Sequence, residues 1–338
     1  MNIDKIKKVI EDEPTYRMGQ VWHAIFVDLI DSWDKCTTLP KKLRETLETE
    51  SPVKIDGEVF GSESSRSLKA LITLEDGEKI EAVLLLHRDG RRTVCVSSQV
   101  GCAMGCKFCA TGKMGRERNL TVGEIVEQVL FFARYLRVLS KENNRVTNVV
   151  FMGMGEPFLN YDNVMSAIRI LNDDDGLNIG ARHISVSTCG LVDGINKFAR
   201  EPLQINLAIS LHAPNDELRT SLMPVNRLNS LDDLMTAVRN YTAKSRRQVM
   251  FEYMMIDGVN DKEVHAKELI ALLMSDKLFV VNLIRYNPTG SFSASSASSI
   301  NKFKNLLMRA GTKVTQRQAF GADIKAACGQ LATQKRNK

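Results

Sequence analysis

The sequence predicts an α/β fold in which six β-strands and their intervening helices form a closed or partly closed barrel behind a helical N-terminal region and a β-meander. Three observations predict this fold. Apolar residues recur at helical spacing through residues 3–49. Two Asp-Gly pairs separate β-rich runs between residues 68 and 97. From residue 93 onward, short apolar runs alternate with amphipathic stretches, which is typical of a parallel sheet.

The N-terminal third divides into a helical part and a β-rich part. Helices are expected over residues 3–13, 16–33 and 39–49. The period then changes to that of strands, over residues 68–74, 79–86 and 93–97. Asp76-Gly77 and Asp89-Gly90 separate these runs and favour tight turns. We therefore expect a helical accessory domain over residues 1–50 and a β-rich extension over residues 51–91.

The barrel is expected over residues 92–318, followed by a C-terminal segment over residues 319–338. Its strands are predicted at residues 93–98, 147–152, 183–188, 204–210, 249–255 and 278–284. Two of the helices between them have N-terminal capping patterns, Thr121-x-x-Glu124 and Ser230-x-x-Asp233. Barrels of this kind carry their active sites at the carboxyl ends of the strands. We expect the chemistry at that end.

Composition and cysteine usage predict a cytoplasmic protein with a polyanionic partner. The first residues, MNIDKIKKVIEDEP, lack the apolar core of a signal peptide, and nowhere do 18 uncharged apolar residues run together. Three of the seven cysteines crowd into eight residues, which suits metal binding in a reducing compartment better than a disulfide framework. A net charge of +6 favours RNA as a partner and gives no reason to expect a membrane.

The cysteine-rich stretch GCAMGCKFCATG is the strongest chemical signal. It places Cys102, Cys106 and Cys109 in the loop after the first barrel strand. A structural zinc site needs four ligands, usually in two pairs, and the chain has no second pair. A ferredoxin-type cubane takes four cysteines, so three would leave one iron open to another ligand. The alternative of three buried structural thiols requires this spacing to arise by chance.

This C-x3-C-x2-C pattern, with Phe108 before its last cysteine, resembles the motif of radical S-adenosylmethionine (SAM) enzymes. The resemblance implies a partial (β/α)6 TIM-type barrel and one 4Fe-4S cluster bound by the three cysteines. It also implies that SAM binds the open iron through its amino and carboxylate groups, and that one electron cleaves SAM to a 5′-deoxyadenosyl radical. The protein then supplies orientation and excludes water.

Further stretches resemble the RlmN/Cfr family of radical SAM RNA methyltransferases, and they look closer to its RlmN branch. They are CVSSQVGCAMGCKFCATG, FMGMGEPFLN, VSTCG, SLHAPND, LMPVNR, NLIRYNP and DIKAACGQL. Together they run from about residue 81 to residue 331, in the order of the family. One stray motif cannot explain an ordered series of this length.

The resemblance gives Cys328, Cys95 and Glu81 catalytic roles. One SAM transfers its methyl group to Cys328, and the radical from a second SAM abstracts a hydrogen atom from that S-methyl group. The methylene radical then adds to an electron-poor adenine carbon. Cys95 resolves the resulting protein–RNA crosslink and forms a transient disulfide with Cys328. Glu81 resembles the proton acceptor of the family, while on residue type alone it is equally well a solvated strand charge.

The same resemblance places SAM against the strand ends. Gly155 and Glu156 resemble a GGE-like motif that contacts the methionine amino group, and a glycine there lets backbone approach a ligand closely. The other positions that match SAM contacts are Ser187, Ser210, Leu211, His212 and Asn287. A plain β-turn at Gly155 and a structural role for His212 are the alternatives.

The expected substrates are 23S rRNA at the peptidyl transferase centre and, as a second candidate, the anticodon loop of tRNA. Methylation at adenine C2 is the leading interpretation. Methylation at C8, as in the Cfr branch with its antibiotic resistance, is the alternative, because AFGADI departs from the commoner RlmN wording. A radical SAM enzyme with a non-RNA substrate would have no use for Cys95 and Cys328. An iron-sulfur or zinc RNA-binding module would not cleave SAM.

We also expect an electron donor such as flavodoxin and a monomeric state. Candidate phosphate contacts lie beside the cysteine motif and include Lys107, Lys113, Arg116 and Arg118. The alternative is that these four side chains are ordinary solvent-exposed charges that contact no RNA. If they do contact phosphates, binding should weaken steeply with salt.

Overall fold

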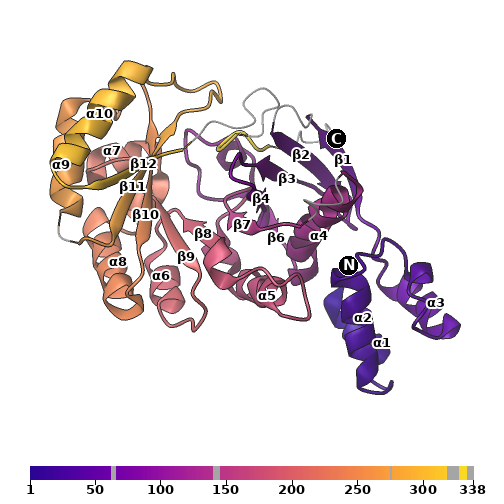
Figure 1. Cartoon of the computed structure of the whole chain (residues 1–338). Coiled ribbons are helices and arrows are strands. Elements are labelled where there is room, and N and C mark those ends of the chain that lie inside the picture. Colours follow the sequence, from indigo (N-terminus) through magenta and orange to yellow (C-terminus); the bar gives the residue numbers. More distant parts are fainter. Residues whose placement is uncertain (62–65, 140–144, 275, 318–326, 333–338) are drawn as a thin grey trace.

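The computed structural model of the chain describes residues 1–61, 66–139, 145–274, 276–317 and 327–332. Its centre is a ten-stranded sheet in the order β1-β2-β3-β4-β7-β8-β9-β10-β11-β12 (Figure 1). The strands are β1 (Asp56–Phe60), β2 (Ser67–Thr73), β3 (Lys79–Leu86), β4 (Arg92–Cys95), β7 (Asn148–Phe151), β8 (Ile184–Thr188), β9 (Asn206–Ser210), β10 (Val249–Met255), β11 (Phe279–Arg285) and β12 (Lys313–Gln316).

β4 joins the meander to the barrel. It pairs antiparallel with β3 and parallel with β7. The strands from β4 through β12 are all parallel to their neighbours, as the predicted barrel requires. The sheet order ends at β12 without a return to β4, so the described strands form an open, partial barrel. β12 lies beyond the six predicted strands, because its residues are mostly exposed and carry no apolar pattern.

Helices follow the strands along the outer side of the curved sheet (Figure 1). They are α4 (Val122–Leu139), α5 (Tyr161–Asn172), α6 (Val192–Phe198), α7 (Asp216–Leu222), α8 (Leu231–Ser245), α9 (Glu263–Leu273) and α10 (Ala297–Arg309). Both predicted capping patterns are confirmed. Ser230 and Asp233 form a reciprocal capping box at α8, and the Glu124 carboxylate accepts from the Thr121 backbone N–H at 2.8 Å.

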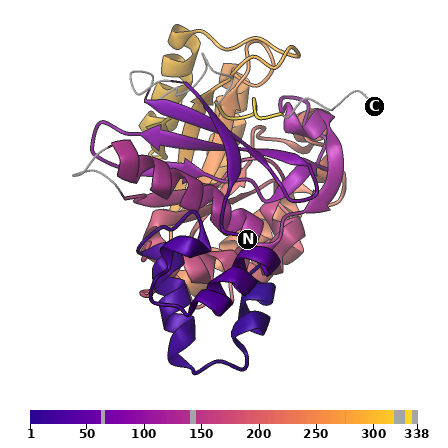
Figure 2. The same ribbon diagram turned by 90° about the vertical axis from the view of Figure 1, so that its right-hand side faces the viewer.

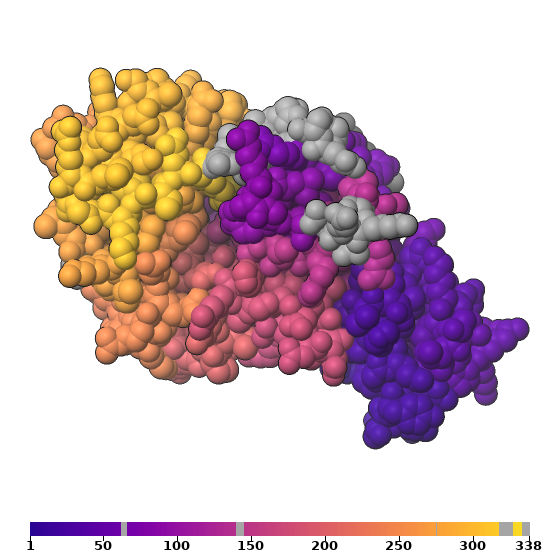
Figure 3. Space-filling view, viewed as in Figure 1, coloured from indigo at the N-terminus to yellow at the C-terminus, as the bar shows by residue number. Residues whose placement is uncertain are grey.

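The N-terminal helices form a protruding lobe (indigo in Figures 2 and 3), on the opposite side of the molecule from β12 (Figure 1). They are α1 (Ile3–Ile10), α2 (Tyr16–Phe26) and α3 (Lys41–Glu50). Ile6, Ile25 and Leu47 are fully buried where these helices meet. α2 ends well before residue 33, because the chain turns at Leu29 with φ +54°. No helix in the described ranges is long and apolar enough to cross a membrane.

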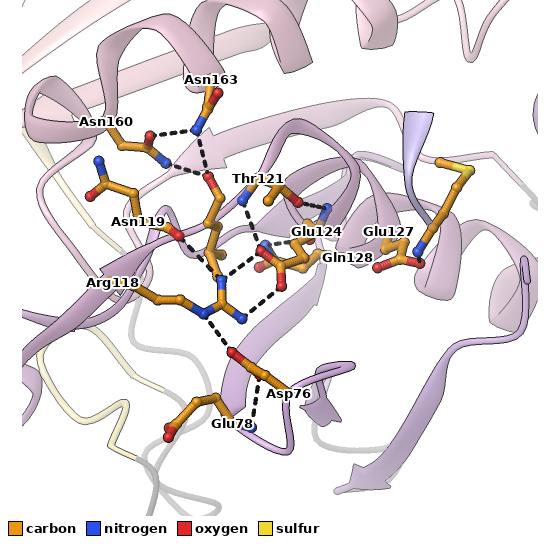
Figure 4. Close-up of polar contacts among 12 residues, drawn as sticks. Asp76, Glu78, Arg118, Asn119, Thr121, Glu124, Glu127, Gln128, Asn160 and Asn163 are labelled. Carbon is orange, nitrogen blue, oxygen red and sulfur yellow. Dashed lines mark hydrogen bonds and ion pairs between the residues drawn. The ribbon is translucent and has the colours of Figure 1, made fainter. Parts of the chain in front are cut away.

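The cysteine motif is carried by a small hairpin of its own. β5 (Gln99–Cys102) pairs antiparallel with β6 (Gly115–Asn119) as a separate two-stranded sheet. Arg118 on β6 donates to the Glu124 carboxylate of α4 at 2.8 and 2.9 Å and to Asp76 of the β2–β3 turn at 2.6 Å (Figure 4). This bidentate pairing ties the hairpin to both the barrel and the meander.

Candidate active site

A cavity lies at the carboxyl ends of the parallel strands, where the topology predicts it. Three cysteines converge on it from the end of β5 and from the loop that follows. The predicted residues that line it are Cys102, Cys106, Cys109, Gly155, Glu156, Ser187, Ser210, His212 and Cys328. Leu211, Asn287, Cys95 and Glu81 do not line it. The fold therefore brings together most of the predicted site from five separate segments.

The three cysteines suit a cationic, multinuclear cluster. The pKa of Cys102 is raised to about 11, mainly by burial and to a smaller extent by the nearby Cys109 and Glu156. Burial and the two neighbouring thiols also raise the pKa of Cys106. A bound cation reverses this cost by holding thiolates. In the described ranges no three His, Cys, Asp or Glu side chains surround one metal ion. Three separate thiolates can each bind a different iron of a multinuclear cluster.

Glu156 holds the ends of two strands together. Its side chain is 3% exposed, and its two carboxylate oxygens accept from the backbone N–H groups of Phe158 at 3.0 Å and Cys189 at 2.8 Å. Burial raises the pKa of this carboxyl. The preceding Gly155 has φ +102°, and a Cβ there would lie 2.6 Å from the Gln99 Cβ. Only glycine fits at this position.

The loops after β8 and β9 are gathered by Arg219 of α7, which sequence reasoning missed. Its guanidinium is 1% exposed. It donates to the carbonyls of Cys189 at 2.6 Å, Ser210 at 3.3 Å and Leu211 at 3.3 Å. A further bond of 2.7 Å reaches the Asn226 side-chain oxygen. Ser187 and Ser210 lie with their hydroxyls 3.4 Å apart at this edge. An arginine on a short polar helix gives no local signal of such a role.

His212 is a buried, neutral imidazole. Burial lowers its pKa to about 3, and the charge of Arg219 acts in the same direction. Its Nδ1 accepts from the Met254 backbone N–H at 3.1 Å. Its ring meets Phe108 edge-on at 4.7 Å between centroids. His212 therefore links the cysteine loop to β10.

The segment that carries Cys328 is fastened beside the cysteine loop. Ala110 N–H donates to the Gly329 carbonyl at 2.7 Å, and the Thr111 hydroxyl donates to the Leu331 carbonyl at 2.5 Å. Asn287 donates to the Cys328 carbonyl at 3.2 Å. Asn287 thus positions the backbone of Cys328 in this structure. Residues 318–326 and 333–338, most of the predicted C-terminal segment, lie outside the described residues.

Cys95 and Cys328 lie near one another. The pKa of Cys95 is raised to about 12, first by burial and then by the charge of Cys328, while Arg317 and the Met152 backbone act in the opposite direction. All seven cysteines fall within the described ranges, and all seven are free thiols.

Glu81 is not a solvated strand charge, so that interpretation is wrong. Its side chain is 4% exposed and pairs with Lys69 at 2.9 Å. Its second carboxylate oxygen accepts from the Ala332 backbone N–H at 3.0 Å. Glu81 therefore holds the end of the segment that carries Cys328.

Two of the predicted phosphate contacts are occupied within the protein. Arg118 is bound to Glu124 and Asp76 (Figure 4), and the Lys113 ammonium donates to the Thr289 carbonyl and the Ser291 hydroxyl at 3.1 and 2.9 Å. Lys107 and Arg116 are exposed, and neither forms an ion pair with any described residue. Of the four candidates, Lys107 and Arg116 are therefore the ones open to a polyanion, and Arg116 also donates to the Asn119 side-chain oxygen at 3.5 Å.

Comparison with known proteins gives consistent similarities. Residues 96–270 match the model of the radical SAM superfamily. A protein of Dictyoglomus thermophilum named "Probable dual-specificity RNA methyltransferase RlmN" is 45% identical over 98% of this chain and 94% of its own length. A protein of the same name from Staphylococcus carnosus is 45% identical over 95% of this chain and 88% of its own. The crystal structure of a radical SAM methyltransferase from Sphaerobacter thermophilus superposes with a TM-score of 0.92 at 46% identity, covering 96% of both chains.

Proposed function

Because this chain belongs to the radical SAM superfamily and, within it, to the RlmN family, we propose that it is an RNA methyltransferase that methylates C2 of an adenine. The proposed substrates are 23S rRNA at the peptidyl transferase centre and, as a second one, the anticodon loop of tRNA. The observation that carries the proposal is the placement of Cys328 beside both the three-cysteine loop and Cys95. A radical SAM enzyme for another substrate class has no need of that pair.

Cys102, Cys106 and Cys109 would hold one 4Fe-4S cluster. When bound, the cluster supplies the electron that cleaves SAM to a 5′-deoxyadenosyl radical. The chain itself contributes a pocket lined by the buried rings of Phe108 and His212. Gly155 and Glu156 would receive the methionine amino group of SAM. The other residues proposed to contact SAM are Ser187, Ser210, Leu211, His212 and Asn287.

Cys328 would accept a methyl group from the first of two SAM molecules used in each turnover. Its backbone is fixed by Asn287 and by the turn at Gly329, so its sulfur stays in the cavity that the cluster loop lines. Cys95 would resolve the RNA crosslink and form a transient disulfide with Cys328. Glu81 would take up a proton, and its bond to Ala332 ties it to the same segment.

The alternative within the family is methylation at C8. The relatives reported above carry the RlmN name, which favours C2. We also propose that the protein acts as a monomer in the cytoplasm, with flavodoxin or a similar protein as the electron donor. The N-terminal helical domain (residues 1–50) would serve as an RNA platform, and the barrel (residues 92–318) would carry the chemistry.

The decisive experiment compares rRNA and tRNA from cells with and without this protein. Nucleosides from each are separated by mass spectrometry, with 2-methyladenosine and 8-methyladenosine as standards. The proposal expects 2-methyladenosine to disappear when the protein is absent. If only 8-methyladenosine is lost when the protein is absent, the methylated carbon is C8 and not C2. If the amount of neither nucleoside changes, adenine methylation of these RNAs is refuted.

Two cysteine variants test the proposed roles. Cys328→Ala should abolish methylation, because no sulfur remains to receive the methyl group. Cys95→Ala should accumulate a covalent protein–RNA adduct that is visible on a denaturing gel. Cys36→Ala is the matched control. The Cys36 thiol is only 4% exposed and does not form the surface that would contact RNA, so this variant should form methylated RNA without an adduct. Free turnover by either active-site variant would contradict its assigned role.

A further inference from the structure

Arg317 is a cation in the middle of the barrel to which the proposed mechanism gives no role. It directly follows β12, and its backbone N–H donates to the Leu283 carbonyl at 2.9 Å. The side chain lines the active-site cavity together with Cys328, Met152 and Glu252. It also lines a second cavity of about 600 Å³ at the other side of the barrel interior. Arg317 therefore lies in the layer that separates the two cavities.

The guanidinium of Arg317 has no carboxylate partner in the described part of the chain. Its Nη1 and Nη2 each lie 3.6 Å from the sulfur of Met152, a weak and neutral acceptor. No described aspartate or glutamate forms an ion pair with it. Glu252 lines the same cavity, but its carboxylate accepts from Asn282 at 2.8 Å. Arg317 is half-buried between the two cavities, and a cation at such a site without a charged partner is costly, so an anion is expected beside it.

The groups that face Arg317 identify that anion. The nearest are Cys95 on β4, Glu252 on β10, Cys328 on the C-terminal segment and His87 after β3. The second cavity also holds Arg88, Arg91 and Asp89, and Asp89 is paired with Arg91 at 2.9 Å. The first cavity also holds Cys102, Cys106, Cys109, Glu156 and His212. The charges of Cys328, Glu252 and Cys95 raise the pKa of Arg317, and that of Cys328 has the largest effect. Both cysteines of the proposed cycle therefore lie within the field of one guanidinium.

We propose that Arg317 is the shared counter-ion of the two reacting thiolates, and thus a positioning residue for the methyl-transfer cycle. This inference rests on the proposed function. In the first half, Cys328 loses its proton to water, its sulfur bonds to the methyl carbon of SAM, and the carbon–sulfonium bond breaks to leave neutral S-adenosylhomocysteine. The guanidinium favours the thiolate that this step requires.

In the second half of the cycle, the Arg317 guanidinium stabilises the thiolate of Cys95. The Cys95 thiolate attacks the Cys328 sulfur of the RNA adduct, and a disulfide forms as the bond from that sulfur to the methylene carbon breaks. The carbon takes the electron pair and a proton, which releases methylated adenine. A cellular dithiol then reduces the disulfide to restore both thiols. Cys328 is an uncharged thioether while it carries the methyl group, so the guanidinium is free for Cys95 at that stage.

The test measures thiol reactivity and does not require turnover. Iodoacetamide alkylation of Cys328 is followed by peptide mass spectrometry between about pH 6 and pH 9, on the fraction of protein that carries no methyl group. Arg317→Gln should move the midpoint of the profile to higher pH and slow alkylation ~10-fold near neutral pH. Arg317→Lys keeps the charge and should stay close to the wild type. Arg182→Gln removes an exposed arginine that bonds Gln204, and should change nothing.

A second variant separates charge from loosened packing. Glu252→Gln keeps an acceptor for Asn282 but removes the competing negative charge, so it should move the midpoint to lower pH, opposite to Arg317→Gln. If Arg317→Gln does not fold, the test is the difference in alkylation midpoint between Glu252→Gln and the wild type. A shift of Glu252→Gln to higher pH, or an unshifted Arg317→Gln profile, would overturn the inference.

Failure of the inference and failure of the proposed function are distinguishable. Methyl occupancy of Cys328 is first measured on the wild-type peptide. If Cys328 of the wild-type protein never carries a methyl group, the proposed function is refuted. If Cys328 of the wild type does carry the methyl group, but the pH profile of alkylation in Arg317→Gln is unshifted, only the counter-ion role of Arg317 is refuted.

Discussion

The two sides of the active site are built in different ways. On the cofactor side, buried polar side chains hold the strand ends from within. Glu156 joins the ends of β7 and β8, and Arg219 gathers the carbonyls after β8 and β9. On the acceptor side, Cys328 lies on a short segment held mainly through its own backbone, by Ala110, Thr111 and Glu81. The first side is part of the barrel, and the second is attached to it.

This difference matches what each side would do. A cofactor site gains from rigid donors fixed before the ligand arrives, because ordering them costs nothing during the reaction. A thiol that first receives a methyl group and then meets an RNA base must be presented to two different partners. Backbone contacts worth about 1 kcal/mol each allow a segment to be held and still to be released. We therefore expect substitutions on the cofactor side to cost more stability than those on the acceptor side.

The largest expected effect on the cofactor side is a pH dependence that comes from His212. Burial lowers its pKa to about 3, whereas an unfolded histidine titrates near 6.5. As the pH falls below about 6.5, the unfolded chain binds a proton that the folded chain excludes. The free energy of unfolding should then fall by on the order of 4 kcal/mol as the pH approaches 3, and stay constant with respect to this group below that.

Urea unfolding of the wild type and of His212→Asn between about pH 7.5 and pH 4 measures this contribution. Asparagine accepts the Met254 N–H and tolerates the φ of +58° at this position, so it is a close replacement without a titrating group. The variant should show the shallower slope. Equal slopes would mean that His212 is not excluded from protonation, and that this side of the site is less closed than its burial implies.

Arg219→Gln should cost about 3 kcal/mol or more in the free energy of unfolding, because several buried carbonyls lose their donor together. Equilibrium unfolding in urea measures it. Arg182→Gln is the matched control, since Arg182 is exposed and donates to Gln204 at 2.7 Å; its loss should stay below about 0.5 kcal/mol. A small effect at Arg219 would remove the main reason for calling the cofactor side rigid.

Sequence patterns predicted more of the residues on the cofactor side than on the acceptor side. Strand periodicity and the order of the βα units place Glu156, Ser187 and Ser210 at one sheet edge, since parallel strands end together. The spacing of the cysteine motif likewise predicts that its three thiols converge. Local signals of this kind come from residues that are close in the chain or repeated along it.

The acceptor side depends on contacts that no local pattern encodes. Thr111 meets Leu331 across 220 residues, and Glu81 meets Ala332 across 251. Arg317 follows β12, a strand with no apolar alternation, so its position in the barrel could not be inferred. Family resemblance pointed to Cys328, but only the fold brings it beside Cys95 and Arg317. Such contacts arise from tertiary packing, which overrides local propensity.

Two glycines with positive φ allow a direct comparison of the two sides. A Cβ at Gly155 would lie 2.6 Å from the Gln99 Cβ, whereas one at Gly329 would lie 3.3 Å from the Phe108 carbonyl oxygen. Gly155→Ala therefore combines backbone strain with a steric clash and should cost about 3 kcal/mol, while Gly329→Ala should cost about 1 kcal/mol. Thermal melting of both variants measures the difference. The reverse order would contradict the assignment of the rigid side.

The smallest effect is expected at Thr111, on the acceptor side. Thr111→Val removes the hydroxyl that donates to the Leu331 carbonyl while keeping the shape of the side chain, so global stability should fall by only about 1 kcal/mol. The change should instead appear locally, as faster hydrogen exchange of the amides of residues 327–332, because the segment opens without unfolding the barrel. Thr46→Val, whose exposed hydroxyl bonds the Lys42 carbonyl within α3, is the control and should leave that exchange unchanged. If Thr111→Val instead accelerates exchange throughout the parallel strands, then the segment that carries Cys328 is an integral part of the barrel. The two sides would then open as one unit.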